Sequence, residues 1–118
     1  MDILESDGLL RLLDAASGNH EIIANNLANL ETPGYKTGRM RFAQELEAVL
    51  DERGNIREGK KIDTETFRPL FPDAGPDGND VSLEREIVEM NKNTLRMKLY
   101  LSILGSRIKK VQTAIESR

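Results

Sequence analysis

The sequence predicts an all-α fold in which long N- and C-terminal helices pair as an antiparallel, coiled-coil-like hairpin, with an irregular or extended middle segment. Three observations support this prediction: a long heptad repeat near the C-terminus, a weaker one near the N-terminus, and opposite net charges on the two. We expect an N-terminal helix over residues 1–31, a turn, short helix and irregular linker over 32–80, and a C-terminal heptad helix over 81–118. A chain of 118 residues suits one structural unit.

The C-terminal repeat is the strongest pattern in the chain. No proline interrupts it, Ser82 is a candidate N-cap, and Glu84 and Glu86 place negative charge in the first turn. Lys109 and Lys110 place positive charge toward the other end, so we expect a helix from about residue 82 to about 116. With one polar exception, Thr94, its stripe is apolar and steps alternately by four and three: Leu83, Ile87, Met90, Thr94, Met97, Leu101, Leu104, Ile108, Val111 and Ile115.

The N-terminal repeat has the same period but weaker composition. Its stripe is Leu9, Leu13, Ala16, His20, Ile23, Leu27 and Leu30. The helix should end near Glu31, because Pro33 disfavours helical geometry in the preceding residue. Pro33-Gly34 is typical of the centre of a type II turn. Residues 1–30 carry five acidic residues and one basic residue, whereas 93–118 carry six basic and one acidic, so antiparallel pairing would match their charges.

The middle of the chain has a different composition. Residues 39–52 could form a short amphipathic helix with Phe42, Leu46, Val49 and Leu50 on one side. Residues 51–80 hold three of the four prolines and thirteen charged residues, so we expect an irregular or extended segment. Three further apolar residues, Leu95, Leu99 and Ile103, lie off the main C-terminal stripe. One short helix cannot cover that surface, so we expect helices from other subunits against it.

The composition excludes several classes of protein chemistry. Without cysteine and with one histidine, the chain has no disulfide framework, thiolate nucleophile or multi-histidine metal site. Residues 77–80 faintly resemble a calcium loop, but they are more simply a turn before the C-terminal helix. A net charge of −3 disfavours nucleic-acid binding, and we see neither a cleaved signal peptide nor a membrane span. We therefore expect that the chain is not an enzyme and that it binds no cofactor, metal ion, nucleic acid or small-molecule substrate.

One short stretch, residues 24–36, has an unusual composition: Ala-Asn-Asn-Leu-Ala-Asn-Leu-Glu-Thr-Pro-Gly-Tyr-Lys. Asparagines are poor helix-interior residues and good local hydrogen-bonding groups, so three in the last helical turns predict contacts to backbone or to neighbouring subunits. The Tyr35 ring has a polar tip and suits a partly wet interface. The residues that we single out here are Asn25, Asn26, Asn29, Thr32, Pro33, Gly34 and Tyr35.

This stretch resembles the N-terminal signature of bacterial flagellar rod and hook proteins, and residues 77–86 resemble the entry to the C-terminal helix in short proximal-rod members. The resemblance implies a structural subunit that self-assembles with other rod proteins into a helical, torque-transmitting drive shaft. It also implies a periplasmic rod location, partners among membrane-ring and export-gate components, and type III export without a cleaved signal peptide. The expected assembly seam is Leu9, Leu13, Ile23, Leu27, Leu83, Ile87, Met90, Met97, Leu101, Leu104, Ile108, Val111 and Ile115.

Two other classes of protein provide alternatives. A soluble coiled-coil adaptor or export chaperone would form a discrete dimer or tetramer with ordered helices in isolation. An enzyme such as a peptidoglycan hydrolase would need a positioned pair of acids or a base in a pocket, and the sequence offers no such pair with a reason to be buried.

Overall fold

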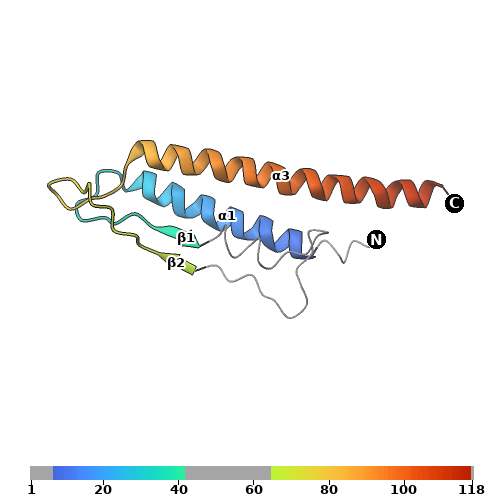
Figure 1. Ribbon diagram of the computed structural model, residues 1–118, viewed down its shortest axis with the longest axis horizontal. Coiled ribbons are helices and arrows are strands. Elements are labelled where there is room, and N and C mark those ends of the chain that lie inside the picture. Colours follow the sequence, from blue (N-terminus) through green and yellow to red (C-terminus); the bar gives the residue numbers. More distant parts are fainter. Residues whose placement is uncertain (1–6, 42–64, 118) are drawn as a thin grey trace.

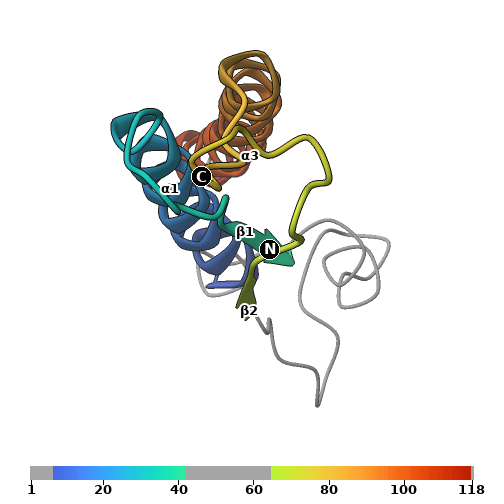
Figure 2. The same ribbon diagram turned by 90° about the vertical axis from the view of Figure 1, so that its left-hand side faces the viewer.

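Two long helices and a two-stranded sheet make up the computed structural model, which describes residues 7–41 and 65–117. The elements are α1 (Asp7–Ala28), β1 (Arg39–Arg41), β2 (Glu65–Phe67) and α3 (Leu83–Glu116). Helices α1 and α3 lie side by side and run in opposite directions, and the sheet lies along α1 (Figure 1). The view along the molecule shows α1, α3 and the sheet at three corners (Figure 2).

Local hydrogen bonds set the helix ends close to their predicted positions. Helix α1 ends at Ala28, where the backbone N–H of Asn29 is shared between the carbonyls of Asn25 and Asn26, at 3.1 Å each. This is three residues before the expected end. Helix α3 matches its expected range, and the predicted N-cap is confirmed because Ser82 Oγ accepts from the backbone N–H of Arg85.

The sheet adds a β element to a fold that the sequence predicted as all-α. Strands β1 and β2 are antiparallel, with Arg39 opposite Phe67 and Arg41 opposite Glu65. Residues 39–41 were expected to begin a short helix, and that prediction is wrong for these three; the remainder of 39–52 lies outside the described residues. Strands of three residues are too short to show alternation, so their cross-strand pairs were not visible in the sequence.

The contact between α1 and α3 shares only part of the predicted stripes: Leu9, Ala16 and Ile23 of α1 and Met97 and Leu104 of α3 lie in it. The buried row of α1 steps by three and four, and the row of α3 that faces it has the same spacing. The buried apolar cluster is Leu9, Leu12, Ala15 and Ala16, and against it pack Met40, Met97, Tyr100 and Leu104. Leu13 and Leu27 are only half-buried and His20 is exposed, so the α1 stripe is rotated from its predicted position.

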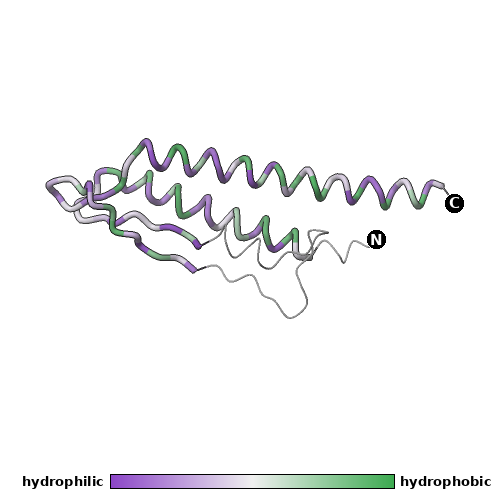
Figure 3. Tube along the Cα trace, in the orientation of Figure 1, coloured by the Kyte–Doolittle hydropathy of each residue, from purple (hydrophilic) through white to green (hydrophobic). Residues whose placement is uncertain are grey.

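Two buried polar layers define the register of the helix pair. Asn19 Nδ2 donates to Asn93 Oδ1 at 2.9 Å, and Asn26 Nδ2 donates to a carboxylate oxygen of Glu86 at 2.6 Å. From the first layer to the second, the residue number on α1 rises by seven and that on α3 falls by seven, which is one heptad on each helix. The same spacing places Asp7 opposite about residue 105, so the last turns of α3 extend about 16 Å past the described part of α1. Apolar residues continue along this extension (Figure 3).

Candidate assembly interface

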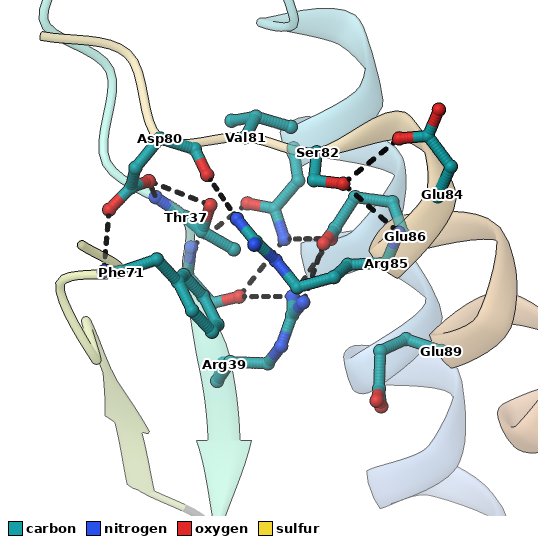
Figure 4. Close-up of polar contacts among 12 residues, drawn as sticks. Thr37, Arg39, Phe71, Asp80, Val81, Ser82, Glu84, Arg85, Glu86 and Glu89 are labelled. Carbon is teal, nitrogen blue, oxygen red and sulfur yellow. Dashed lines mark hydrogen bonds and ion pairs between the residues drawn. The ribbon is translucent and has the colours of Figure 1, made fainter. Parts of the chain in front are cut away.

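A buried polar cluster connects α1, β1 and α3 at the closed end of the hairpin. The carboxylate of Glu86 has no exposed surface and accepts from Asn26 Nδ2 and from both terminal nitrogens of Arg39, at 2.8 and 2.5 Å (Figure 4). Asn26 also bonds the Gly38 backbone twice, donating to its carbonyl and accepting from its N–H at 2.9 Å each. The side chains of Asn26, Arg39 and Glu86 therefore join α1 and β1 to α3, which lies far from them in the sequence.

The charges in this cluster balance one another. Burial alone would lower the pKa of Arg39, but the hydrogen bonds and negative charge of Glu86 outweigh it and raise that pKa above its ordinary value. A bidentate guanidinium–carboxylate pair is strong and directional. The pair therefore fixes the direction in which β1 leaves the turn relative to the start of α3.

A second cluster surrounds the carboxylate of Asp80, just before α3. Its Oδ1 accepts from the backbone N–H of Thr37 at 2.6 Å and from the Thr37 hydroxyl at 2.8 Å, and its Oδ2 accepts from the Phe71 N–H at 3.2 Å. Burial would raise the pKa of Asp80, but these hydrogen bonds outweigh it and hold the pKa below its usual value. The ionised carboxylate thus joins the segments that follow α1 and precede α3.

Arginine and aromatic side chains complete this end of the molecule. The guanidinium of Arg85 lies 3.8 Å from the ring centroid of Phe71, and that of Arg39 lies 5.7 Å from the same centroid (Figure 4). Arg85 also donates to both carboxylate oxygens of Asp73 and to the Asp80 carbonyl. The loop from β2 to α3 is consequently attached to the first turn of α3 by both charge and stacking.

The turn of residues 32–35, which belongs to the signature stretch, is bound to this end through its backbone. Tyr35 N–H donates to the Thr32 carbonyl at 3.2 Å, and Gly34 has a φ of 75°, as the predicted type II turn requires. Gly34 N–H donates to the Asp77 carbonyl at 3.0 Å. Asn79 Nδ2 donates to the carbonyls of Asn29 and Thr32. The turn after α1 is therefore held against the loop before α3.

The asparagines of the signature have different surroundings. Asn26 is buried in the Glu86 cluster, Asn29 donates to the Asn25 carbonyl at 2.7 Å, and Asn25 itself is exposed. Pro33 is exposed, and the half-buried ring of Tyr35 lies under the guanidinium of Arg68, at 5.4 Å. The prediction that these asparagines contact the backbone is confirmed for Asn26 and Asn29 within the subunit.

Sequence reasoning missed several residues that build this end. Two side-chain contacts hold this end together: Asp80 accepts hydrogen bonds from Thr37, and Glu86 pairs with Arg39. In the sequence, only the position of these four residues within or near the two signature stretches indicated a role for them. A usable signal was present: Asn19 and Asn26 are seven residues apart, as are Glu86 and Asn93. Polar residues at heptad spacing indicate paired buried layers, which a stripe defined by apolar residues alone omits.

Helix α3 carries two apolar flanks that the described part of the chain leaves exposed. At about 100° per residue, one flank lies about 60–120° to one side of Asn93, and the other lies about 80–160° to the other side. Their eight members have exposed fractions between 38% and 66%. The first flank is Leu83, Ile87, Leu101 and Ile108, and the second is Val88, Leu95, Leu99 and Ile103.

The predicted seam residues divide between the inside of the subunit and its surface. Leu9 and Ile23 are buried, and Met97 and Leu104 pack on the core cluster. Leu13, Leu27, Met90 and Val111 are half-buried. Five lie at the surface, with exposed fractions from 44% to 65%: Leu83, Ile87, Leu101, Ile108 and Ile115.

Other kinds of site are not present among the described residues. Residues 7–41 and 65–117 contain no group of three or more metal-ligating side chains. No helix in the same ranges is long and apolar enough to cross a membrane. What this part of the chain does offer is a rigid closed end and a long helix with two exposed apolar flanks, which is the geometry of an assembly subunit rather than of a small-molecule site.

Comparison with known proteins agrees with this geometry. Residues 13–36 match the family model described as flagella basal body rod protein. The flagellar basal body rod protein FlgB of Aeromonas hydrophila is 29% identical over 115 residues, covering 88% of this chain and 86% of the relative. FlgB of Yersinia enterocolitica is 28% identical, covering 93% of this chain and 95% of the relative, and FlgB of Salmonella typhimurium is also 28% identical. The family model matches the signature, and these relatives align with the chain over most of both lengths, so the chain is similar to flagellar basal body rod proteins.

Proposed function

We propose that this chain is a structural subunit of the proximal rod in the bacterial flagellar basal body, where it self-assembles with other rod proteins into a helical drive shaft. The observation that carries the proposal is the pair of exposed apolar flanks on α3, in a chain whose nearly full-length relatives are rod proteins. The role is structural and not enzymatic.

The mechanism is burial of these flanks between neighbouring subunits. A helix with apolar residues on three sides needs packing partners on each of them. Among residues 7–41 and 65–117, α1 covers one side of α3, and we assign the other two sides to helices of neighbouring subunits. Each fully buried leucine or isoleucine contributes about 1.5–3 kcal/mol, so many weak contacts add to a dense and stiff tube. Coiled-coil-like packing of the seam residues between subunits is part of this proposal.

Torque transmission requires that each subunit itself be stiff. The Glu86–Arg39 pair and the Asp80 cluster hold the closed end through side chains from segments far apart in sequence. Such networks resist shear because their ion pairs and hydrogen bonds are directional. A subunit built in this way turns as one body when its neighbours push on α3.

Location and partners follow from the same role. The rod crosses the periplasm, so the subunit is exported through the flagellar type III apparatus without a cleaved signal peptide. At the base of the rod it contacts membrane-ring and export-gate components, and along the rod it contacts copies of itself and other rod proteins.

The proposal is tested by removing and restoring the gene in the bacterium that encodes it. We expect the deletion strain to lack rods in purified basal bodies and to be non-motile, and the wild-type gene to restore both. A Leu95→Asp variant should be exported yet fail to restore rods, whereas Lys92→Glu, a charge change on the same exposed stretch, should restore them.

Two results would contradict this role. Normal rods in the deletion strain would exclude an essential structural subunit. A chain that remains inside the cell as a soluble dimer or tetramer would favour the coiled-coil adaptor or export chaperone instead.

A further inference from the structure

Leu70 combines two properties that folding alone does not explain. It is 65% exposed, and its φ of 58° places a non-glycine residue in the left-handed region, which is unfavourable for a branched apolar side chain. The surrounding structure imposes this conformation, because the next residue, Phe71, donates its N–H to Asp80 and stacks on Arg85. Backbone strain that presents an apolar side chain to solvent is typical of a contact site.

The position of Leu70 in the fold limits what it can contact. It lies in the loop between β2 and α3, which together with the turn after α1 forms the closed end of the hairpin (Figure 1). Near it, Asp73 and Asp77 are exposed acidic residues. Residues 29–37 and 68–85, which make up this closed end, carry five acidic and three basic side chains. Asp80 is buried, so the exposed acids of this end are Glu31, Asp73, Asp77 and Glu84, and Leu70 is its most exposed large apolar residue.

The opposite end of the molecule has complementary properties. Residues 96–117 of the chain carry five basic side chains and one acidic one. Beyond the described start of α1, α3 lines a hollow of about 380 Å³ with Ser106, Lys109, Lys110 and Thr113. These four residues follow the spacing of one helix face, and the surface that they present to the hollow is mostly apolar, as the aliphatic stems of lysine side chains allow. A leucine side chain fits within that volume.

We propose that the closed end of one copy of this chain docks on the free end of α3 in a second copy, with Leu70 entering the hollow and the acidic loop facing Lys109 and Lys110. The inference rests on the proposed function, because it names one subunit contact of the assembly. The two surfaces are different and lie at opposite ends, so the contact is head-to-tail and extends into an open chain rather than closing as a dimer.

A mixing experiment on the purified full-length chain tests this contact. At low salt and rising concentration, analytical ultracentrifugation of the wild-type chain should show an open series of oligomers, and added salt should shorten it. Leu70→Asp removes the anchor on the closed end, and Lys109→Glu with Lys110→Glu reverses the charge of the hollow. Each variant alone should remain monomeric. Their mixture should form a one-to-one dimer and stop there, because each variant retains one working surface.

Controls separate the contact from an effect on folding. Aspartate tolerates the left-handed region better than leucine, so Leu70→Asp should keep or raise the melting temperature while abolishing the oligomers. Lys98→Glu is the matched control on α3, because it makes the same charge change on an exposed lysine about two turns before the hollow. It should leave the oligomer series intact.

Each other outcome overturns the proposal. A wild-type chain that is monomeric at every concentration shows that a second copy is not the occupant, and unchanged oligomers in either variant show that the wrong surface was named. Failure of the mixture to form dimers indicates a contact between like ends. All of these results leave the proposed function standing, because that function is judged separately by rods in the restored deletion strain.

Discussion

At the scale of single residues, Asp80 couples the fold to pH. Its pKa is lowered in the folded state, so its contribution to stability is fully present above the unfolded value of about 3.9 and is lost as pH falls through the lower folded value. We expect Asp80→Asn to lower the free energy of unfolding by about 1–2 kcal/mol at pH 7 and to flatten its decline below about pH 4. Urea unfolding across pH 2–7 measures both effects.

The control for this prediction is Asp14→Asn, which changes an exposed carboxylate on α1. Its pH profile should follow that of the wild-type chain. If Asp80→Asn also followed the wild-type profile, the hydrogen bonds from Thr37 and Phe71 would not stabilise the ionised form.

Among the residues of the closed end, we expect replacement of Glu86 to lower the free energy of unfolding most. Glu86→Ala leaves the partly buried guanidinium of Arg39 without its carboxylate and removes the partner of Asn26 Nδ2. Breaking a buried ion pair on one side costs about 3 kcal/mol or more, a large share of a typical domain stability of about 5–15 kcal/mol. Thermal unfolding of Glu86→Ala, Arg39→Met and the double variant measures the coupling. Additive losses would show that the pair contributes nothing beyond its separate members.

These residues also mark where prediction from the sequence was limited. The existence and range of α3 followed from a single local pattern, and Ser82 and the Pro33-Gly34 turn followed from backbone chemistry within a few residues. The clusters around Glu86 and Asp80 join positions more than forty residues apart, so no local pattern indicates their partners. The rotated contact row had a similar cause: the polar pairs Asn19–Asn93 and Asn26–Glu86 lie in it, so a stripe of apolar residues alone passes beside it.

At the scale of elements, different faces of α3 serve folding and assembly: one face packs inside the subunit, and the others are exposed. Leu101 is 54% exposed, whereas Leu104, one turn later, packs on the core cluster. Leu101→Asp should change the free energy of unfolding by at most about 0.5 kcal/mol yet block incorporation into rods, because it places a charge in the seam between subunits. Circular dichroism melting and electron microscopy of basal bodies measure the two effects.

Leu104→Asp is the informative comparison for this element. It should lower the stability of the isolated chain by about 2 kcal/mol or more, because it places a carboxylate against the buried apolar cluster of α1. Full motility of the Leu101→Asp strain would count heavily against packing of this flank in the rod.

The turn after α1 is a second element whose effect on stability can be measured separately from its effect on assembly. Pro33 is exposed and fixes its own φ, so Pro33→Ala should lower the free energy of unfolding by about 0.4–1 kcal/mol through the unfolded chain. The turn holds the loop before α3 through the contacts of Gly34 and Asn79, so we also expect fewer subunits per rod. Quantitative immunoblots of basal bodies check this; an unchanged rod would make the proline incidental to assembly.

At the scale of the whole molecule, the exposed flanks of α3 make helical order depend on assembly. Helix α3 has 34 residues, and its two apolar flanks have no cover among the described residues. A helix without tertiary packing is only marginally stable in water. The isolated chain should therefore show fewer helical residues than α1 and α3 contain together, and neighbouring subunits should supply the missing contacts.

Circular dichroism with light scattering over a concentration series tests this coupling directly. A monomer with incomplete helix that gains helix as particle mass rises is the expected result, since burial of the two flanks of α3 must outweigh the conformational entropy lost on ordering its free end. The gain should be absent in Leu101→Asp, which has the same free end but a damaged flank. A stable, fully helical dimer or tetramer at every concentration would instead show that the flanks are satisfied in a closed particle, and a closed particle has no surface left with which to extend a rod.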